Sequence, residues 1–322
     1  MKKNILSLIL TITVLLLFGI YLYSNPQILI ILKDISPLFL IIIMFLFLLL
    51  FLLEGIFIKV ALNIFDKHID LKESYYLSTV SRIGNYLLPM RAGAIFRATY
   101  LKNKYQFEYS KFLSTLYAYY ILLFLLNAIL ALFVLLFKYL SLSIFYPIIT
   151  LFFILLLLGT LFVILFRKTI PTREGKGLKY INKGIGIFNK FLTSWDMIVK
   201  RKKLFFSLLL LTMGNILING VIFYVEFLSL KININILDIV LYTCLSGVSL
   251  LVSITPGSLG LREAIFLFTS ESIGLSQDQI MQLAFLDRGV LFLLLLILLI
   301  VITVFVKKFK LKDIFFVKEK TE

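Results

Sequence analysis

The sequence has one cysteine, Cys244, and one histidine, His68, among 322 residues. A single thiol excludes an internal disulfide framework, and a single imidazole excludes a histidine-rich metal site. Acidic residues are also scarce, with 17 Asp and Glu against 33 Lys and Arg. The sequence contains no nucleophile elbow, phosphate-binding loop, dinucleotide fingerprint or His-Glu-x-x-His motif. We therefore expect no cofactor, no metal and no assignable catalytic residue.

Apolar residues are abundant instead. They make up 61% of the chain, which includes 32 Phe, and the mean hydropathy is +1.04. A water-soluble domain could not bury this much apolar surface, so the composition predicts an all-α polytopic membrane protein. In such a protein, surplus Lys and Arg mark cytoplasmic loops, and we expect no nucleic-acid partner.

The apolar runs predict about six full spans in a single membrane domain, residues 1–322. The first run, Ile5 to Tyr23, is long enough to cross about 30 Å of hydrocarbon, and no cleavage site follows it, so we expect an uncleaved span. The predicted spans are 5–23, 36–62, 110–137, 143–166, 204–230 and 286–306.

Basic residues gather in three places and predict the orientation. Lys2 and Lys3 precede the first span, the loop 167–203 is strongly basic, and the tail 307–322 carries six lysines. The positive-inside rule places all three in the cytoplasm. We therefore expect a multi-pass protein of the cell membrane with both termini cytoplasmic.

Two segments, 74–103 and 237–275, contain too many charges, prolines and glycines to be ordinary spans. Because the flanking spans fix the sides of the membrane, each segment must cross an even number of times. A broken, re-entrant helical hairpin satisfies this, and the two hairpins would enter from opposite faces. Pro89 and Gly93 align with Pro256 and Gly260 at a shift of 167 residues, which indicates an inverted repeat, although a chance match is the alternative.

A broken membrane helix exposes backbone polar groups, which is tolerated only inside protein or beside a wet cavity. The half-helix after each break, starting near 90–93 and near 258–260, would point its positive end into that cavity and favour an anion. Arginine suits a phosphate because its fork binds two oxygens, while Glu263 and Asp287 could pair with the arginines of an empty site. The candidate substrate-binding residues are Asn85, Pro89, Arg91, Gly93, Arg97, Pro256, Gly257, Gly260, Arg262, Glu263, Asp287 and Arg288.

Simpler interpretations exist for several charged residues. Arg82 and Arg97 could extend to the cytoplasmic interface. Asp287 and Arg288 could be an end-of-helix pair at the outer surface. Glu54, inside the second span, would be a packed or interfacial carboxyl. The prolines and glycines could also act as turns between short helices, which is compatible with a site.

The basic loop contains a helical pattern. Seven apolar residues follow spacings of three and four and would share one face of a helix in the membrane interface. They are Leu178, Ile181, Ile185, Phe188, Leu192, Trp195 and Val199. Gly184 and Gly186 weaken the helix, so an ordinary basic connector is the alternative.

Three stretches resemble a known family. "GNYLLPMRAGAIFRATYL" is similar to its first hallmark, Asn-x-x-x-Pro-x-Arg-x-Gly followed by Arg. "TPGSLGLREAIF" resembles the second, Pro-Gly-x-x-Gly-x-Arg-Glu, and "GLSQDQIMQLAFLDRGV" resembles the segment after it. On these motifs the chain resembles the flippase-like membrane domain of lysylphosphatidylglycerol synthases.

The resemblance implies lipid translocation, or handling of lipid-linked headgroups, at the two Pro/Gly motifs. Two departures stand out. Tyr119 and Tyr120 occupy a place where the family commonly has Glu-Arg, which puts an intramembrane ion pair there in doubt. Only a short tail follows Val306, so we expect a stand-alone membrane member without the aminoacyl-transferring domain.

Three functions are compatible with these features. The first is a flippase for an anionic phospholipid or a polyprenyl-phosphate-linked lipid. The second is an enzyme acting on a lipid carrier, for which Glu263 and Asp287 are the candidate bases. The third is a partner subunit of a glycosyltransferase or lipid-modifying enzyme, bound through the basic loop.

Overall fold

A computed structural model of the chain describes residues 33–87, 91–138, 145–166, 179–252, 260–270 and 274–305, together with positions 23 and 169. The regular structure in these ranges is helical, which confirms the predicted all-α class. The elements are α3 (Pro37–Asn63), α4 (Leu71–Leu87), α5 (Ala92–Tyr105), α6 (Tyr109–Lys138), α7 (Phe145–Leu165), α8 (Lys179–Lys200), α9 (Lys202–Ser229), α10 (Ile236–Val248), the 3-10 helix η1 (Ser249–Val252), α11 (Leu261–Phe268) and α13 (Gln277–Phe305).

Five helices in the described part of the chain are long and apolar enough to cross a membrane: α3, α6, α7, α9 and α13. They match five of the six predicted spans, and the protein is therefore a multi-pass membrane protein. The sixth predicted span, 5–23, falls outside the described residues, as does the tail 307–322. Helix α13 begins at Gln277, nine residues before the predicted start of its apolar run at 286.

Polar residues set where α3 and α10 begin. Ser36 caps α3 through a hydrogen bond from the amide of Leu38, and Pro37 follows at the first helical position. Asn235 caps α10 by accepting a hydrogen bond from the amide of Leu237 at 2.9 Å. Such caps satisfy amide groups that have no partner inside the helix.

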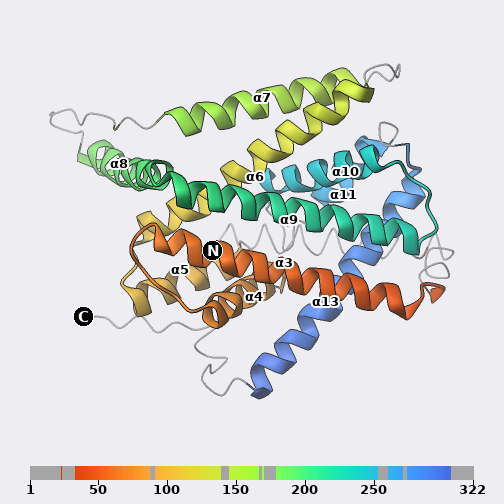
Figure 1. Ribbon diagram of the computed structural model, residues 1–322, viewed down its shortest axis with the longest axis horizontal. Coiled ribbons are helices and arrows are strands. Elements are labelled where there is room, and N and C mark those ends of the chain that lie inside the picture. Colours follow the sequence, from red (N-terminus) through yellow and green to blue (C-terminus); the bar gives the residue numbers. More distant parts are fainter. Residues whose placement is uncertain are drawn as a thin grey trace.

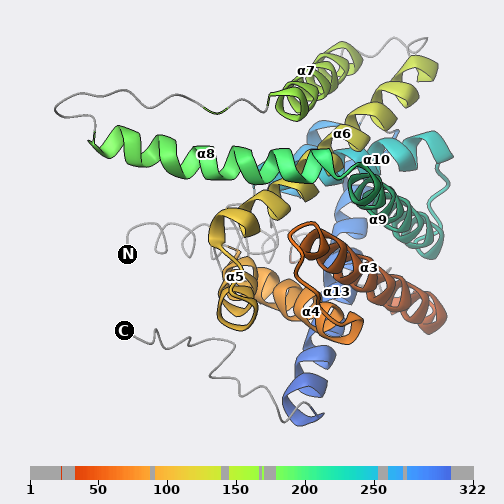
Figure 2. The same ribbon diagram turned by 60° about the vertical axis from the view of Figure 1, so that its left-hand side comes forward.

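Helices α3 and α9 lie side by side and antiparallel, and α6 crosses obliquely beside them with α7 packed along its outer side (Figure 1). Most of α7 is exposed, including Leu155 and Phe162. Helix α8 extends away from the bundle and joins it at its C-terminal end (Figure 2). There Trp195 is buried and donates a hydrogen bond to the carbonyl of Val163 at 3.1 Å, which attaches α8 to α7.

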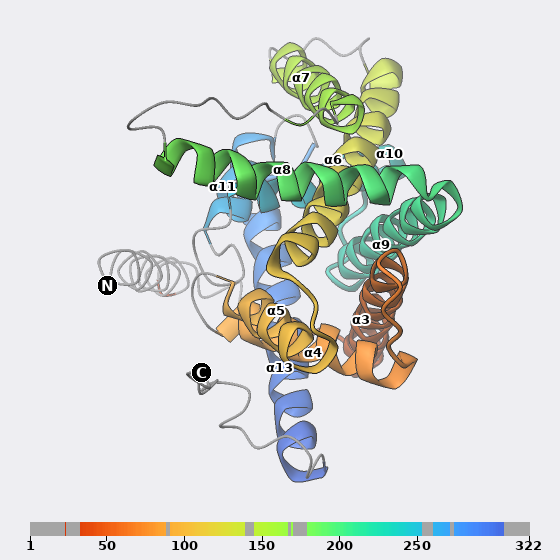
Figure 3. The same cartoon turned by 90° about the vertical axis from the view of Figure 1, so that its left-hand side faces the viewer.

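In the two segments singled out as broken hairpins, the structure describes α4 and α5 in the first, and α10, η1 and α11 in the second. Helices α4 and α5 pack against one another below α6 (Figure 3), and α10 with η1 packs against α11. The α4–α5 hairpin lies toward the end of the bundle where α3 ends, and α10–α11 lies toward the opposite end (Figure 1). An inverted repeat requires this arrangement, while the depth of each hairpin in a bilayer stays a prediction.

An aromatic cluster joins the second hairpin to the bundle. The ring of Tyr242 on α10 stacks on that of Phe266 on α11, with centroids 3.8 Å apart. Phe223 and Phe227 of α9 meet the same ring edge-on, at 4.8 and 5.6 Å. Because these rings are fully or almost fully buried, they fix α9, α10 and α11 relative to one another.

Candidate functional site

A cavity of about 250 Å³ opens between the two halves of the bundle. Helices α3, α4, α5 and α6 of the first half and α9, α10, η1, α11 and α13 of the second contribute to its wall. Apolar residues of α3, including Phe47, Leu50 and Phe51, form one side. The polar side carries five guanidinium groups, from Arg82, Arg91, Arg97, Arg262 and Arg288.

The break in the first hairpin orients Arg91. This residue is the N-cap of α5 and has the left-handed backbone conformation, with φ 53° and ψ 45°. Asn85 accepts a hydrogen bond from the amide of Ala94 at 3.2 Å and so caps the first turn of α5. The side-chain oxygen of Asn85 therefore stabilises the start of α5, whereas the sequence had suggested a headgroup contact alone.

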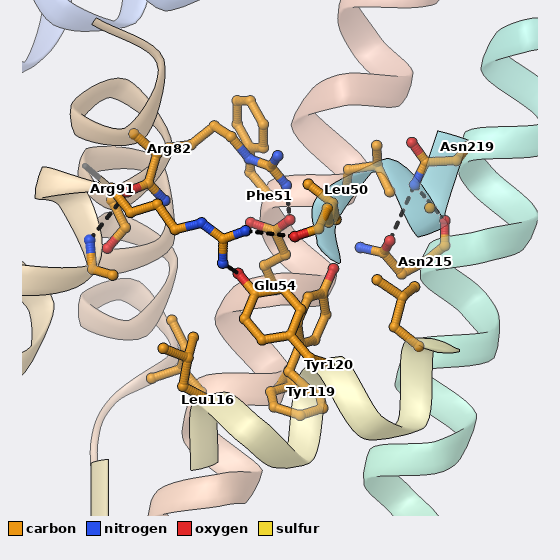
Figure 4. Close-up of a pocket in the computed structure, with 18 of the residues that line it drawn as sticks. Leu50, Phe51, Glu54, Arg82, Arg91, Leu116, Tyr119, Tyr120, Asn215 and Asn219 are labelled. Atoms are coloured by element: carbon orange, nitrogen blue, oxygen red, sulfur yellow. Dashed lines mark hydrogen bonds and ion pairs between the residues drawn. The ribbon is translucent and has the colours of Figure 1, made fainter. Parts of the chain in front are cut away.

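Arg91 has two neutral partners. Its guanidinium donates to the phenol oxygen of Tyr120 and, at 2.8 Å, to the carbonyl of Leu250 (Figure 4). It also lies over the ring of Tyr120, 4.9 Å from the centroid. Because Tyr120 belongs to α6 and Leu250 to η1, Arg91 connects the two halves of the protein across the cavity.

Arg82 and Arg97 differ in what holds them. Arg82 forms an ion pair with Glu54 of α3 (Figure 4). Arg97 lies over the ring of Phe112, 5.4 Å from its centroid. No carboxylate in the described ranges pairs with Arg91 or Arg97. Both line the cavity, so this end of the site has an excess of positive charge.

The second hairpin contributes an ion-pair network around the start of α11. Arg262 pairs with Asp287, and Arg288 pairs with Glu263 at 3.0 Å. Glu263 also accepts a hydrogen bond from the amide of Gly260 at 2.8 Å. The carboxylate of Glu263 thus occupies the positive end of α11, so in this structure the start of α11 is already capped by an anionic group of the chain itself.

Asp287 and Arg288 lie eleven and twelve residues into α13, counted from Gln277, and Asp287 is 4% exposed. The alternative interpretation, in which Asp287 and Arg288 form a pair at a helix end on the outer surface, is therefore wrong. Tyr86 of α4 donates a hydrogen bond to the carbonyl of Arg288 at 3.4 Å, which connects the first hairpin to α13.

Three amides line the cavity beyond the arginines. Asn219 donates to the side chain and to the carbonyl of Asn215, at 3.0 and 2.8 Å (Figure 4). Asn127 of α6 is 1% exposed, and both polar atoms of its amide are buried with no hydrogen-bond partner among the described residues. Buried amides normally have hydrogen-bond partners, so Asn127 is suited to bind a polar group that enters the cavity.

The structure brings most of the predicted site residues together. Asn85, Arg91, Arg97, Arg262, Asp287 and Arg288 line one cavity, and Glu263 lies directly behind it. Gly260 serves as the N-cap of α11 with φ 83°. Gly93 is buried between α4 and α5, where a Cβ would lie 1.9 Å from the carbonyl oxygen of Ser81, and its contact with a substrate stays a prediction. Pro89, Pro256 and Gly257 fall outside the described residues.

The sequence interpretation missed several cavity residues. Glu54 had been expected to be a packed or interfacial carboxyl, and for Arg82 extension to the interface had been left open as an alternative, yet they pair inside the cavity. Asn127, Asn215 and Asn219 went unnoticed. Their signal was present, since an amide within an apolar span is costly and Asn215 and Asn219 are spaced to share a helix face.

The described residues contain no group of three or more His, Cys, Asp or Glu placed to hold a metal ion.

Comparison with known proteins gives one family match. The model of the family described as "Lysylphosphatidylglycerol synthase TM region" matches residues 4–298. No curated protein and no solved structure matches the chain. The family match includes both hairpins and every residue that lines the cavity. On this evidence the chain belongs to the lysylphosphatidylglycerol synthase transmembrane-region family.

Proposed function

We propose that the protein is a lipid flippase that moves an anionic phospholipid, or a polyprenyl-phosphate-linked lipid, between leaflets. The observation that carries this proposal is the pair Arg91 and Arg97. Both guanidinium groups face a cavity within the bundle, and no described carboxylate pairs with them. Uncompensated intramembrane charge is costly, and a phosphate would compensate it with charge-assisted hydrogen bonds.

The cavity also fits the rest of such a lipid. Its apolar wall on α3 suits the first carbons of a chain, and the amides of Asn127 and Asn215 suit an uncharged part of a headgroup. The carboxylates Glu54 and Asp287 are each paired with an arginine. The described cavity wall is therefore a poor match for a cationic headgroup, which would need a carboxylate of its own.

Group transfer on a lipid carrier is less well supported. It would require a carboxylate able to accept a proton from the attacking group. Of the two candidate bases, Glu263 caps α11 and pairs with Arg288, and Asp287 pairs with Arg262. We therefore favour movement of the lipid over chemistry on it.

The test is lipid translocation by the purified protein in proteoliposomes. A fluorescent phosphatidylglycerol is placed in both leaflets, and a membrane-impermeant quencher reports how fast the inner pool reaches the outside. We expect Arg91→Gln and Arg97→Gln each to slow translocation about 10-fold or more, since a charge-assisted hydrogen bond contributes roughly 1.5–3 kcal/mol.

Arg201→Gln is the matched control, because Arg201 pairs with Asp66 outside the cavity. It removes the same charge and should leave translocation unchanged. The proposal is wrong if wild-type protein moves neither phosphatidylglycerol nor a polyprenyl phosphate, or if Arg201→Gln slows translocation as much as the cavity variants do.

A further inference from the structure

One buried carboxyl in the second half has no assigned role. Glu226 of α9 is 0% exposed, and both of its carboxyl oxygens are buried with no hydrogen-bond partner in the described part of the chain. The charged groups that act on it are Asp287 of α13 and Arg262 of α11, and Tyr242 of α10 faces the same place. An isolated carboxylate is very costly to bury, so its position calls for an explanation.

With Glu226 included, the buried groups around α11 and α13 contain one more carboxyl than guanidinium groups. The buried network around α11 and α13 contains the carboxyls of Glu226, Glu263 and Asp287 but only the guanidinium groups of Arg262 and Arg288. One bound proton would neutralise it. Arg262 Nε lies 3.7 Å from Glu263 Oε1 but has no hydrogen-bond partner among the described residues, so the network is not saturated by its own hydrogen bonds.

The three carboxyls differ in how free they are to exchange a proton. Glu263 is engaged by Arg288 and by the amide of Gly260. Asp287 is held by Arg262, but its side chain lines the cavity. Glu226 has no hydrogen-bond or ion-pair partner among the described residues, and it lies beside Asp287. A proton could therefore pass between cavity water, Asp287 and Glu226.

We propose that Glu226 and Asp287 form a proton-binding site and that protons bound there are coupled to lipid movement; this rests on the function proposed above. A phosphate entering from the first half would meet Arg262 and compete with Asp287 for it. The displaced carboxylate of Asp287 then takes a proton that water carries into the cavity from the bulk solution as hydronium: an O–H bond of hydronium breaks, and an O–H bond forms on Asp287. When the lipid leaves, Arg262 pairs with Asp287 again, and the O–H bond breaks as the proton returns to water on the other side.

Through this coupling, a proton gradient across the membrane can drive lipid movement. The negative charge of one phosphate and the positive charge of one proton enter the buried network together, so its net charge stays constant. Each pH unit across the membrane corresponds to about 1.4 kcal/mol for one proton, which is roughly a tenfold ratio of lipid between leaflets.

The experiment imposes a pH difference of one unit on proteoliposomes that contain fluorescent phosphatidylglycerol and an internal pH-sensitive dye. With wild-type protein we expect a leaflet asymmetry approaching tenfold, proton flow that accompanies the lipid, and loss of the asymmetry when a protonophore removes the gradient. In Glu226→Gln the ratio of rates with and without the gradient should fall to about one.

Glu73→Gln is the control, because Glu73 lies outside the cavity and binds Lys104 at the surface; it should respond to the gradient as wild-type does. Wild-type lipid movement that ignores the gradient would refute proton coupling and leave the flippase proposal standing. Absence of any lipid movement would refute the flippase proposal. If Glu226→Gln does not fold, the wild-type proton-to-lipid ratio decides: a ratio near one supports the inference, and a ratio near zero refutes it.

Discussion

Arginines that share this cavity are held by different kinds of partner. Arg82 and Arg262 have carboxylates, whereas Arg91 has a phenol and a carbonyl. A neutral acceptor forms a weaker hydrogen bond with a guanidinium than a carboxylate does. A phosphate can therefore displace the partners of Arg91 at a lower cost in free energy. Tyr120, at a position where an ion pair was in doubt from the sequence, thus keeps Arg91 oriented and available.

Glu73 gives a pH prediction away from the candidate spans. Burial alone would raise the pKa of this carboxyl, but hydrogen bonds from Lys104, Tyr100 and Tyr105 outweigh it and hold the pKa below the ordinary 4.5. A lowered pKa in the folded state adds stability above the unfolded value, and this stability is lost as the pH falls through the folded value. We expect the C-terminal turn of α5 to loosen below about pH 4.

Hydrogen exchange of residues 100–105 between pH 3 and 7 measures this effect. In Glu73→Gln the carboxylate is absent, so the acid-dependent step in protection should shrink or vanish, and the melting temperature at pH 7 should fall by about 1–3 °C. An unchanged acid step in the variant would assign the transition to another group.

Charged residues of the site were more predictable than neutral ones. Arg91, Arg262 and Asp287 stood out because charge inside an apolar run is expensive and needs a partner. The partners themselves did not stand out, because Glu54 meets Arg82 from a different helix, across 28 positions of sequence. Glu226 escaped notice for the same reason, since its setting exists only once α9, α11 and α13 are packed.

Helix starts at the two breaks were predicted to within a few residues. Half-helices were expected near 90–93 and 258–260, and α5 begins at Ala92 and α11 at Leu261. Proline and glycine carry this information because they limit backbone hydrogen bonding and conformation locally. The start of α13 was missed because Ser276 and Gln279 form a reciprocal cap upstream of the apolar run, a local signal that hydropathy does not contain.

The close packing of α4 on α5 gives a prediction at the level of the element. Gly93→Ala would place a Cβ 1.9 Å from the Ser81 carbonyl oxygen and force the two helices apart. Overpacking of this kind costs about 1–3 kcal/mol. Thermal unfolding in detergent should show a lower melting temperature, and translocation should slow because Arg91 and Arg97 move with α5.

Gly159→Ala on α7 is the matched control, because a Cβ there would meet no atom within 4 Å. It should be neutral or slightly stabilising, as alanine favours a helix over glycine. Equal loss of stability in both variants would mean that the contact between α4 and α5 is not what Gly93 protects.

The basic helix was predicted as an element but only partly in its contacts. Helix α8 spans Lys179–Lys200 within the predicted loop, and Leu192 and Trp195 of the predicted face are buried. Ile198, outside that face, is buried as well, and Phe188 is exposed. The periodicity could not reveal that α8 packs on α6 and bonds to α7 through Trp195, so its contact with the membrane interface stays a prediction.

Over the whole molecule, the order of elements repeats. A long helix, a broken hairpin and a second long helix occur as α3, α4–α5 and α6, and again as α9, α10–α11 and α13. Hydropathy alone located the long helices because about 20 apolar residues are needed to span a bilayer. It could not show that both halves enclose one cavity, since that depends on contacts between residues such as Arg91 and Leu250.

Orientation in the membrane can be checked by cysteine labelling, because the chain has a single cysteine and Cys244 is fully buried. We expect Lys190→Cys on α8 to react with an impermeant thiol reagent only when the cytoplasmic face is open. Lys231→Cys, just after α9, should react only from outside. Labelling of both positions from the same face would contradict the predicted orientation of the spans. The chain without added cysteines gives the background labelling.

The left-handed backbone of Arg91 has a consequence for how this position can change. Such a conformation costs a non-glycine residue on the order of 1 kcal/mol, and glycine would adopt it without that penalty. Selection for stability alone would therefore favour glycine over Arg91, and the positive charge would be lost. A chain that retains arginine here keeps a cation in its cavity but has a less stable fold. Selection for thermostability should therefore favour glycine at position 91, and selection for function should favour arginine.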